Sequence, residues 1–151
     1  MENTELTQEI GKPAFRLIVA GSRRFANYGA VKLVLDKMLA GKRNTHRVII
    51  VSGAAQGPDT LGRAYAIENG FPLEVYEADW DNVGRSAGYR RNEEMGRVSD
   101  ALLAFWDLKS TGTRHMIDWM YKAGKPVRIA EVDTIFQCVN RMVPYPLQEE
   151  E

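Results

Sequence analysis

Five short apolar segments, each separated from the next by a helical pattern, constrain the fold of this chain more than any other feature. The segments are FRLIVA (15–20), RVIIVS (47–52), LEVYEA (73–78), ALLAFW (101–106) and PVRIAEV (126–132). Several are nearly continuous in Val, Ile, Leu and Phe, which is typical of parallel strands covered on both faces. Strands that alternate with helices predict a parallel sheet with right-handed crossovers, and we expect the strand order 3-2-1-4-5.

The helical patterns between these strands complete the fold prediction. Amphipathic stripes over 31–38 and 116–121 each stop at a glycine, and residues 58–69 open with a proline that a first helical turn tolerates. Residues 86–98 are mostly charged and offer few apolar anchors, while residues 133–143 are expected to form a last short helix. The fold class is therefore α/β: a single Rossmann-like, doubly wound domain with a mainly parallel five-stranded sheet and helices on both faces.

Length and composition bound the number of domains and the class of partner. At 151 residues the chain is one domain, and we expect a flexible tail at 1–13, a folded body at 14–143 and an acidic tail at 144–151. Twenty basic residues balance twenty acidic ones, so no overall field attracts duplex nucleic acid. The first residues lack the bases and apolar run of a signal peptide, and no segment approaches the ~20 apolar residues of a membrane span. We expect a cytoplasmic protein with no membrane partner.

Several kinds of chemistry are disfavoured by what the sequence lacks. Cys138 is the single cysteine, and the two histidines, His46 and His115, lie on different predicted elements, so we expect no metal site. The dinucleotide fingerprint Gly-x-Gly-x-x-Gly and the phosphate loop ending in Gly-Lys-Ser or Gly-Lys-Thr are both absent. We therefore expect no cofactor of those kinds.

Ligands of such sheets bind beyond the carboxyl ends of the strands, and the first strand is followed there by GSRRF. Gly21 permits a tight turn, Ser22 offers a hydroxyl, and the guanidinium of Arg23 suits phosphate oxygens. The second strand is followed by SGAAQGPD, in which glycines let backbone amides face an anion at a helix start. The residues concerned are Ser52, Gly53, Gly57 and Asp59. Asp59 either caps this helix or accepts hydrogen bonds from a ribose.

Two further segments are predicted at the same edge of the sheet. After the fourth strand, DLKSTGTRHM combines Ser110, Gly112 and Thr113 at a helix start, although Thr111 or Thr113 acting as a plain N-cap is the alternative. In the charged segment 86–98, we expect Arg91 and Asn92 to contact a phosphate, sugar or base, and Tyr89 or Trp80 to stack on the base. The alternative is that this helix presents a solvated face of mixed charge.

The motifs, taken in order, resemble those of one family. VAGSRRF (19–25), VSGAAQGPDTLGRAYA (51–66), GYRRNEEM (88–95) and STGTRHMI (110–117) are similar to the YspA-type branch (DUF2493) of the SLOG superfamily. The resemblance covers about residues 14–130, and the superfamily includes LOG phosphoribohydrolases, the DNA-processing protein DprA and nucleotide sensors. It implies a nucleotide or nucleotide-derived ligand at the glycine loops, bound by a sensor or sequestering module.

The resemblance leaves enzymatic activity open. LOG hydrolases carry Gly-Gly-x-Gly-Thr-x-x-Glu, and here the glutamate position is Met116, whose thioether cannot transfer a proton. Cleavage of an N-glycosidic bond would then fall to Asp59 or Glu94 as the catalytic acid. A third hypothesis is DprA-like handling of single-stranded nucleic acid by the arginines, which are Arg23, Arg24, Arg85, Arg90 and Arg91. Related folds pair through a crossover helix, so Trp119 and Tyr121 predict a homodimer or higher homo-oligomer.

Overall fold

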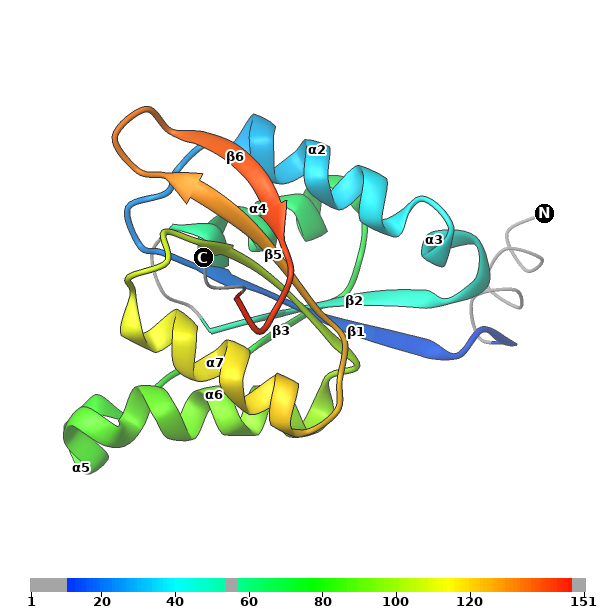
Figure 1. Ribbon diagram of the computed structural model, residues 1–151. Helices are drawn as coiled ribbons and strands as arrows, with labels where there is room; N and C mark the ends of the chain where they lie inside the picture. Colours follow the sequence, from blue (N-terminus) through cyan, green and yellow to red (C-terminus); the bar gives the residue numbers. More distant parts are fainter. Residues whose placement is uncertain (1–10, 54–56, 148–151) are drawn as a thin grey trace.

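A single sheet with helices on both faces forms the body of the protein (Figure 1). The structure is a computed structural model that describes residues 11–53 and 57–147. Within these residues the sheet has six strands in the order β3-β2-β1-β4-β5-β6. They are β1 (Ala14–Gly21), β2 (Arg47–Ser52), β3 (Leu73–Val75), β4 (Ala101–Trp106), β5 (Val127–Asp133) and β6 (Cys138–Val143). The first five run parallel, so the predicted order 3-2-1-4-5 is confirmed.

The helices form two layers, one on each face of the sheet. They are α2 (Tyr28–Leu39), α3 (Lys42–Thr45), α4 (Pro58–Asn69), α5 (Trp80–Val83), the 3-10 turn η1 (Gly84–Ser86), α6 (Ala87–Val98) and α7 (Thr111–Lys122). Helices α2 and α4 cover one face, and α6 and α7 cover the other (Figure 1). Strand β1 serves both cores, because Leu17 and Val19 pack with α2 and α4 while Ile18 and Ala20 pack with α6 and α7. This two-sided burial explains the continuous apolar runs.

The prediction of five strands and a last helix over 133–143 is wrong, because residues 138–143 form β6, antiparallel to β5. The chain reverses at Asp133, whose carboxylate accepts the amides of Ile135 at 2.8 Å and Phe136 at 2.9 Å. Gln137 then adopts a left-handed backbone with φ 55, which stops a helix from forming. The turn therefore sends the chain back along β5 as an edge strand.

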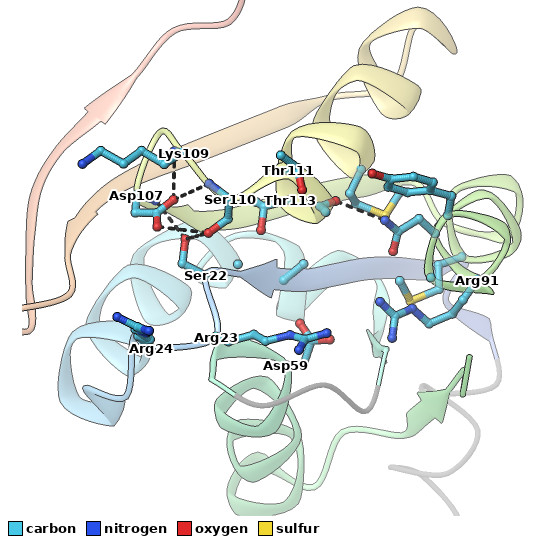
Figure 2. Close-up of a pocket in the computed structure, with 18 of the residues that line it drawn as sticks. Ser22, Arg23, Arg24, Asp59, Arg91, Asp107, Lys109, Ser110, Thr111 and Thr113 are labelled. Atoms are coloured by element: carbon cyan, nitrogen blue, oxygen red, sulfur yellow. Dashed lines mark hydrogen bonds between the residues drawn. The ribbon is translucent and has the colours of Figure 1, made fainter. Parts of the chain in front are cut away.

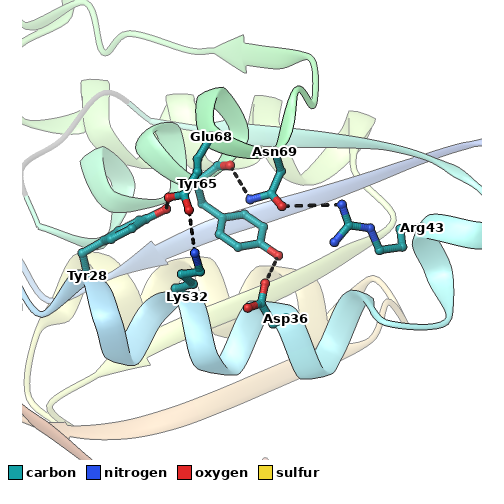
Figure 3. A network of polar contacts seen from close by, with 7 residues as sticks. All are labelled: Tyr28, Lys32, Asp36, Arg43, Tyr65, Glu68 and Asn69. Atoms are coloured by element: carbon teal, nitrogen blue, oxygen red, sulfur yellow. Dashed lines mark hydrogen bonds and ion pairs between the residues drawn. The ribbon is translucent and has the colours of Figure 1, made fainter.

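Helix α4, which begins at the glycine loop after β2, is held against α2 by a polar network (Figure 3). Tyr65 donates to Asp36 at 2.6 Å, and Glu68 accepts from both Tyr28 and Lys32. Burial and the Glu68 carboxylate raise the pKa of Tyr28 to about 12, so this phenol stays a donor throughout the ordinary pH range. The network thus fixes the outer side of α4.

On the opposite face, α6 and α7 pack through a glycine. A Cβ built on Gly96 would lie 2.4 Å from Cε3 of Trp119, so the indole ring rests on the bare backbone of α6. Tyr121 is about half exposed, and its ring meets Tyr145 edge to face at 5.3 Å between centroids. The Trp119 ring thus belongs to the contact between α6 and α7.

We expect Gly96→Ala to lower the free energy of unfolding by about 1–3 kcal/mol, because the added methyl overpacks the Trp119 contact. Urea unfolding followed by far-UV circular dichroism measures the change. The control is Gly41→Ala, since a Cβ on Gly41 meets nothing within 4 Å. If the two variants proved equally stable, the tight α6–α7 contact would be refuted.

Candidate functional site

A cavity of about 660 Å³ opens where the carboxyl ends of β1 and β4 meet α4 and α6 (Figure 2). The structure brings nine of the predicted ligand residues to its lining: Gly21, Ser22, Arg23, Asp59, Arg91, Asn92, Ser110, Gly112 and Thr113. Arg24 and Thr111, which the sequence also offered as a phosphate-binding guanidinium and a loop hydroxyl, line it too. The lining further contains residues that the sequence reasoning did not assign to the ligand: Ala20, Gly88, Met95, Asp107, Lys109 and Thr134, together with Met116. Several loops therefore face one space, which is the arrangement expected of ligand sites in parallel α/β sheets.

Two glycines let the loops approach one another closely. A Cβ on Gly21 would lie 2.1 Å from the carbonyl oxygen of Phe105, and Ser22 donates its amide to that oxygen at 2.8 Å. Gly57 has φ +78, and a Cβ on it would lie 2.7 Å from the carbonyl oxygen of Arg23. Both distances exclude any side chain at these positions. The loops after β1, β2 and β4 are therefore joined backbone to backbone.

Asp107 organises the loop after β4, and the sequence reasoning missed it. Its carboxylate accepts the amides of Lys109 at 2.9 Å and Ser110 at 2.8 Å, and the Ser110 hydroxyl at 3.0 Å. The Asp107 amide in turn donates to the Ser22 hydroxyl at 3.0 Å (Figure 2). Burial alone would raise the pKa of Asp107, but these hydrogen bonds outweigh it and the pKa is lowered. The sequence does carry a signal for this turn, because an aspartate often accepts the amides of the residues two and three positions after it.

The N-terminus of α7 opens on the cavity without a side-chain cap. Ser110 occupies the N-cap position, yet its hydroxyl is engaged by Asp107 and Ser22 rather than by the helix. Neither Thr111 nor Thr113 is the N-cap, and both line the cavity with Gly112. Uncapped amides in a first helical turn carry partial positive charge and favour an anion.

Arg91 reaches from α6 to the glycine loop after β2. Its Nη1 donates to the carbonyl oxygen of Gly53 at 2.7 Å, while its Nε is buried without a hydrogen-bond partner in the described structure. A Cβ on Gly53 would lie 2.9 Å from Oδ2 of Asp59 and 3.0 Å from Nε of Arg91, so both charged groups use the space that glycine leaves. Burial lowers the pKa of Arg91, the nearby Asp59 carboxylate opposes this, and Arg23 adds to it.

Asn92 is only 5% exposed and is held by its amide nitrogen. This nitrogen donates to the carbonyl oxygen of Gly112 at 3.1 Å and lies 3.3 Å from Nδ1 of His115. The His115 ring also packs against Tyr89 in a tilted arrangement, with 4.3 Å between ring centroids and 38° between ring planes. Tyr89 lines the cavity together with Trp80, whose ring packs over Gly88. The cavity thus has an aromatic end beside α6, in addition to its basic and hydroxyl-rich end.

Some predicted residues lie elsewhere. Glu94 is exposed and is not part of the cavity lining, because it falls on the outer side of α6. Ser52 is buried beneath the site, where its hydroxyl donates to the carbonyl oxygen of Asp59 at 3.1 Å. Arg90 is exposed on α6 and does not line the cavity, and the Arg85 side chain lies outside the described residues. Ala54, Ala55 and Gln56 of the glycine loop also fall outside them.

The described residues contain neither a metal-binding cluster nor a membrane-spanning helix. No group of three His, Cys, Asp or Glu side chains is placed there to hold a metal ion. No helix among them has the length and apolar content of a membrane span.

Comparison with known proteins gives the family. The family model described as "YspA, cpYpsA-related SLOG family" matches residues 15–82. The Gene 61 protein of Mycobacterium phage D29 is 36% identical over 118 residues, which cover 74% of this chain and 93% of that protein. This chain belongs to the YspA, cpYpsA-related SLOG family. The resemblance read from the sequence motifs is therefore confirmed.

Two solved structures share the fold of this SLOG-family chain. DNA processing protein A (DprA) from Streptococcus pneumoniae superposes with a TM-score of 0.59 at 17% identity, over 81% of this chain and 51% of that one. The chain thus spans about half the length of DprA. The structural-genomics target TM1055 superposes with a TM-score of 0.55 at 19% identity, over 76% of this chain and 72% of that one. At these identities the likeness shows a common fold.

The partly buried His115 ring leads to a prediction of how the stability of this SLOG-family protein depends on pH. Burial lowers the pKa of His115 below its ordinary value, against the raising effect of Glu93 and Asp118, with Lys122 also lowering it. As pH falls below about 6.5, His115 binds a proton more readily in the unfolded chain than in the folded one. The free energy of unfolding is therefore unaffected by this group above that pH and decreases below it. We expect urea midpoints at pH 7.5, 6.5 and 5.5 to fall less in His115→Asn than in the wild type. His46→Asn is the control and should retain the wild-type loss.

Proposed function

We propose that this protein binds a nucleotide or nucleotide-derived ligand in the loop cavity, as a sensor or sequestering module. The observation that carries the proposal is the Nε of Arg91, a buried cationic N–H that has no partner within the described residues and belongs to a cavity-lining side chain. A buried donor left unpaired costs about 1–3 kcal/mol, and more when it is charged, so a ligand acceptor at this point would stabilise the site. Membership of the SLOG family supports a ligand of this class.

The lining suggests how such a ligand would lie. A phosphate would sit among Ser22, Arg23 and the uncapped amides of Gly112 and Thr113, where hydroxyls, a guanidinium and a helix N-terminus meet. The base would lie at the aromatic end of the cavity, beside Trp80 and Tyr89. Asp59, Arg91 and Asn92 line the cavity as well, and they would contact the sugar or the edge of the base.

A second candidate function is cleavage of an N-glycosidic bond, and the position of Asp59 favours it. This carboxylate is 4% exposed and lines the cavity, so it is available as a general acid or as the group that stabilises an oxocarbenium ion. Met116 also lines the cavity and supplies no proton. Glu94, the other candidate acid, does not reach the lining. If there is turnover, it would therefore depend on Asp59.

Isothermal titration with AMP, GMP, CMP and UMP tests the binding proposal. We expect at least one to bind, and Arg91→Gln to weaken it about 10- to 100-fold, because a hydrogen bond to a charged group is lost. Arg90→Gln is a matched control, since it removes the neighbouring but exposed guanidinium. If no monophosphate bound, or if both variants weakened binding equally, the proposed site would be wrong.

The same mixtures, analysed for free base by chromatography, separate the two functions. Release of base by the wild type, and its loss in Asp59→Asn, would establish the hydrolase. Binding without release of base would rule out the hydrolase and support the binding function.

We further propose that two copies associate through the groove between α2 and β6. This groove has a volume of about 690 Å³ and contains the apolar side chains of Leu33, Val34 and Met142. The same chain carries two protruding apolar side chains in the β5–β6 turn, Ile135 at 85% and Phe136 at 80% exposure. A groove and a protrusion of matching chemistry on one chain favour a second copy as the occupant. The open edge of β6 would run alongside this contact.

We expect a dimer by light scattering at micromolar concentration, and a monomer for the double variant Ile135→Ser and Phe136→Ser. Tyr121→Ser is the control for the crossover-helix surface and should remain dimeric if the groove is the interface. A monomeric wild type would contradict self-association. Dissociation of Tyr121→Ser alone would instead place the interface at α7.

A further inference from the structure

The charges that line the cavity exceed what one phosphate needs. Among the described lining residues, four cationic side chains, Arg23, Arg24, Arg91 and Lys109, face two carboxylates. One of these, Asp107, is already engaged by the amides and hydroxyl of its own loop. The N-termini of α4 and α7, neither with a side-chain cap, each add about half a positive charge. A single phosphate carries about −1.5 to −2 at pH 7, so positive charge remains uncompensated.

The surplus is concentrated at one end of the cavity. Figure 2 shows Arg24 and Lys109 on one side of Ser22, and Arg91 on the other. The side chains of Arg24 and Lys109 are exposed, and no described acidic residue forms an ion pair with either. In this view the two cations lie on the opposite side of Ser22 from Arg91.

The fold uses the backbone of these two residues and leaves their charges available. The carbonyl oxygen of Arg24 accepts from the Gln137 side chain at 2.7 Å, and the amide of Lys109 donates to Asp107. Both main-chain bonds are independent of the side-chain charge. The charges can thus be removed while the loops keep their bonds. Two exposed cations on the cavity lining, with no ion pair to a described carboxylate, can attract a second phosphoryl group.

From this arrangement we infer that the cavity takes a nucleoside diphosphate, or a larger nucleotide with the same diphosphate group, in preference to a monophosphate. The inference rests on the proposed function. The first phosphoryl group lies at Ser22 and the α7 N-terminus, and the second lies on the side of the cavity where Arg24 and Lys109 line it. The diphosphate would therefore extend from the Ser22 hydroxyl towards the cavity mouth.

Titration calorimetry with four matched pairs tests this assignment: AMP with ADP, GMP with GDP, CMP with CDP, and UMP with UDP. For the base that binds, we expect the diphosphate to bind about five- to tenfold more tightly, as two partly exposed charge pairs would give. The double variant Arg24→Gln and Lys109→Gln should lose this preference and keep the monophosphate affinity. The double variant Arg63→Gln and Arg97→Gln removes the same net charge at exposed positions outside the cavity, and should retain the preference.

The outcomes separate the inference from the function on which it rests. Monophosphates that bind as tightly as diphosphates would overturn the inference and leave the proposed function standing. Failure of every mono- and diphosphate to bind would overturn both. A 5′-phosphorylated dinucleotide also carries two phosphate groups, but a sugar separates them, so it serves as the competing ligand in this test. Tighter binding of such a dinucleotide than of the diphosphate would overturn the diphosphate assignment in favour of a nucleic-acid end.

Discussion

The candidate site depends on backbone contacts that only glycine permits. At Gly21 the loop after β1 lies against the carbonyl of Phe105 at the end of β4, and at Gly57 the loop after β2 lies against the carbonyl of Arg23. At each of these glycines, a Cβ atom would lie too close to the facing carbonyl oxygen for any other residue to fit. A parallel sheet brings strand ends to one edge, but it does not by itself bring their loops together. These two contacts do, and the cavity forms in the space between the joined loops and α6.

The electrostatics of the cavity follow from how its polar groups are already engaged. Asp107 directs its carboxylate at the amides of its own loop, and these hydrogen bonds lower its pKa against the effect of burial. Arg91 is held by the Gly53 carbonyl through Nη1, while its Nε has no hydrogen-bond partner among the residues that the structure describes. Asn92 is fixed through its amide nitrogen to the first turn of α7. The protein thus holds polar groups of the cavity lining in place through its own hydrogen bonds.

Much of this arrangement could be predicted from the sequence, and particular residues show where prediction stopped. The strands over 15–20, 47–52 and 101–106 were predictable because burial on both faces demands continuous apolar runs. Strand β6 was not, because CVNRMV is a half-exposed edge strand whose formation depends on the Asp133 turn and on pairing with β5. Pairing with β5 therefore determines this strand, and the local sequence pattern alone does not predict it.

The site residues divide in a similar way. The hydroxyls and glycines of the loops could be recognised by residue type. Asp107 was not singled out, although its spacing to Lys109 and Ser110 is that of an Asx turn. On α6, helical periodicity separates Asn92 and Met95, which face the cavity, from Glu94, which does not. The close approach at Gly57 could not be read from the sequence, since it depends on two loops 34 residues apart, from Arg23 to Gly57.

The polar network of Figure 3 gives α4 a second role. Twelve residues at 1.5 Å each make this helix about 18 Å long, and Asp59 stands at one end while Glu68 is tied to α2 at the other. If a ligand displaced Asp59, the bonds of Tyr65 and Glu68 to α2 would transmit that displacement to α2. Because α2 also forms one wall of the groove beside β6, the loop cavity and that groove are mechanically connected through α4.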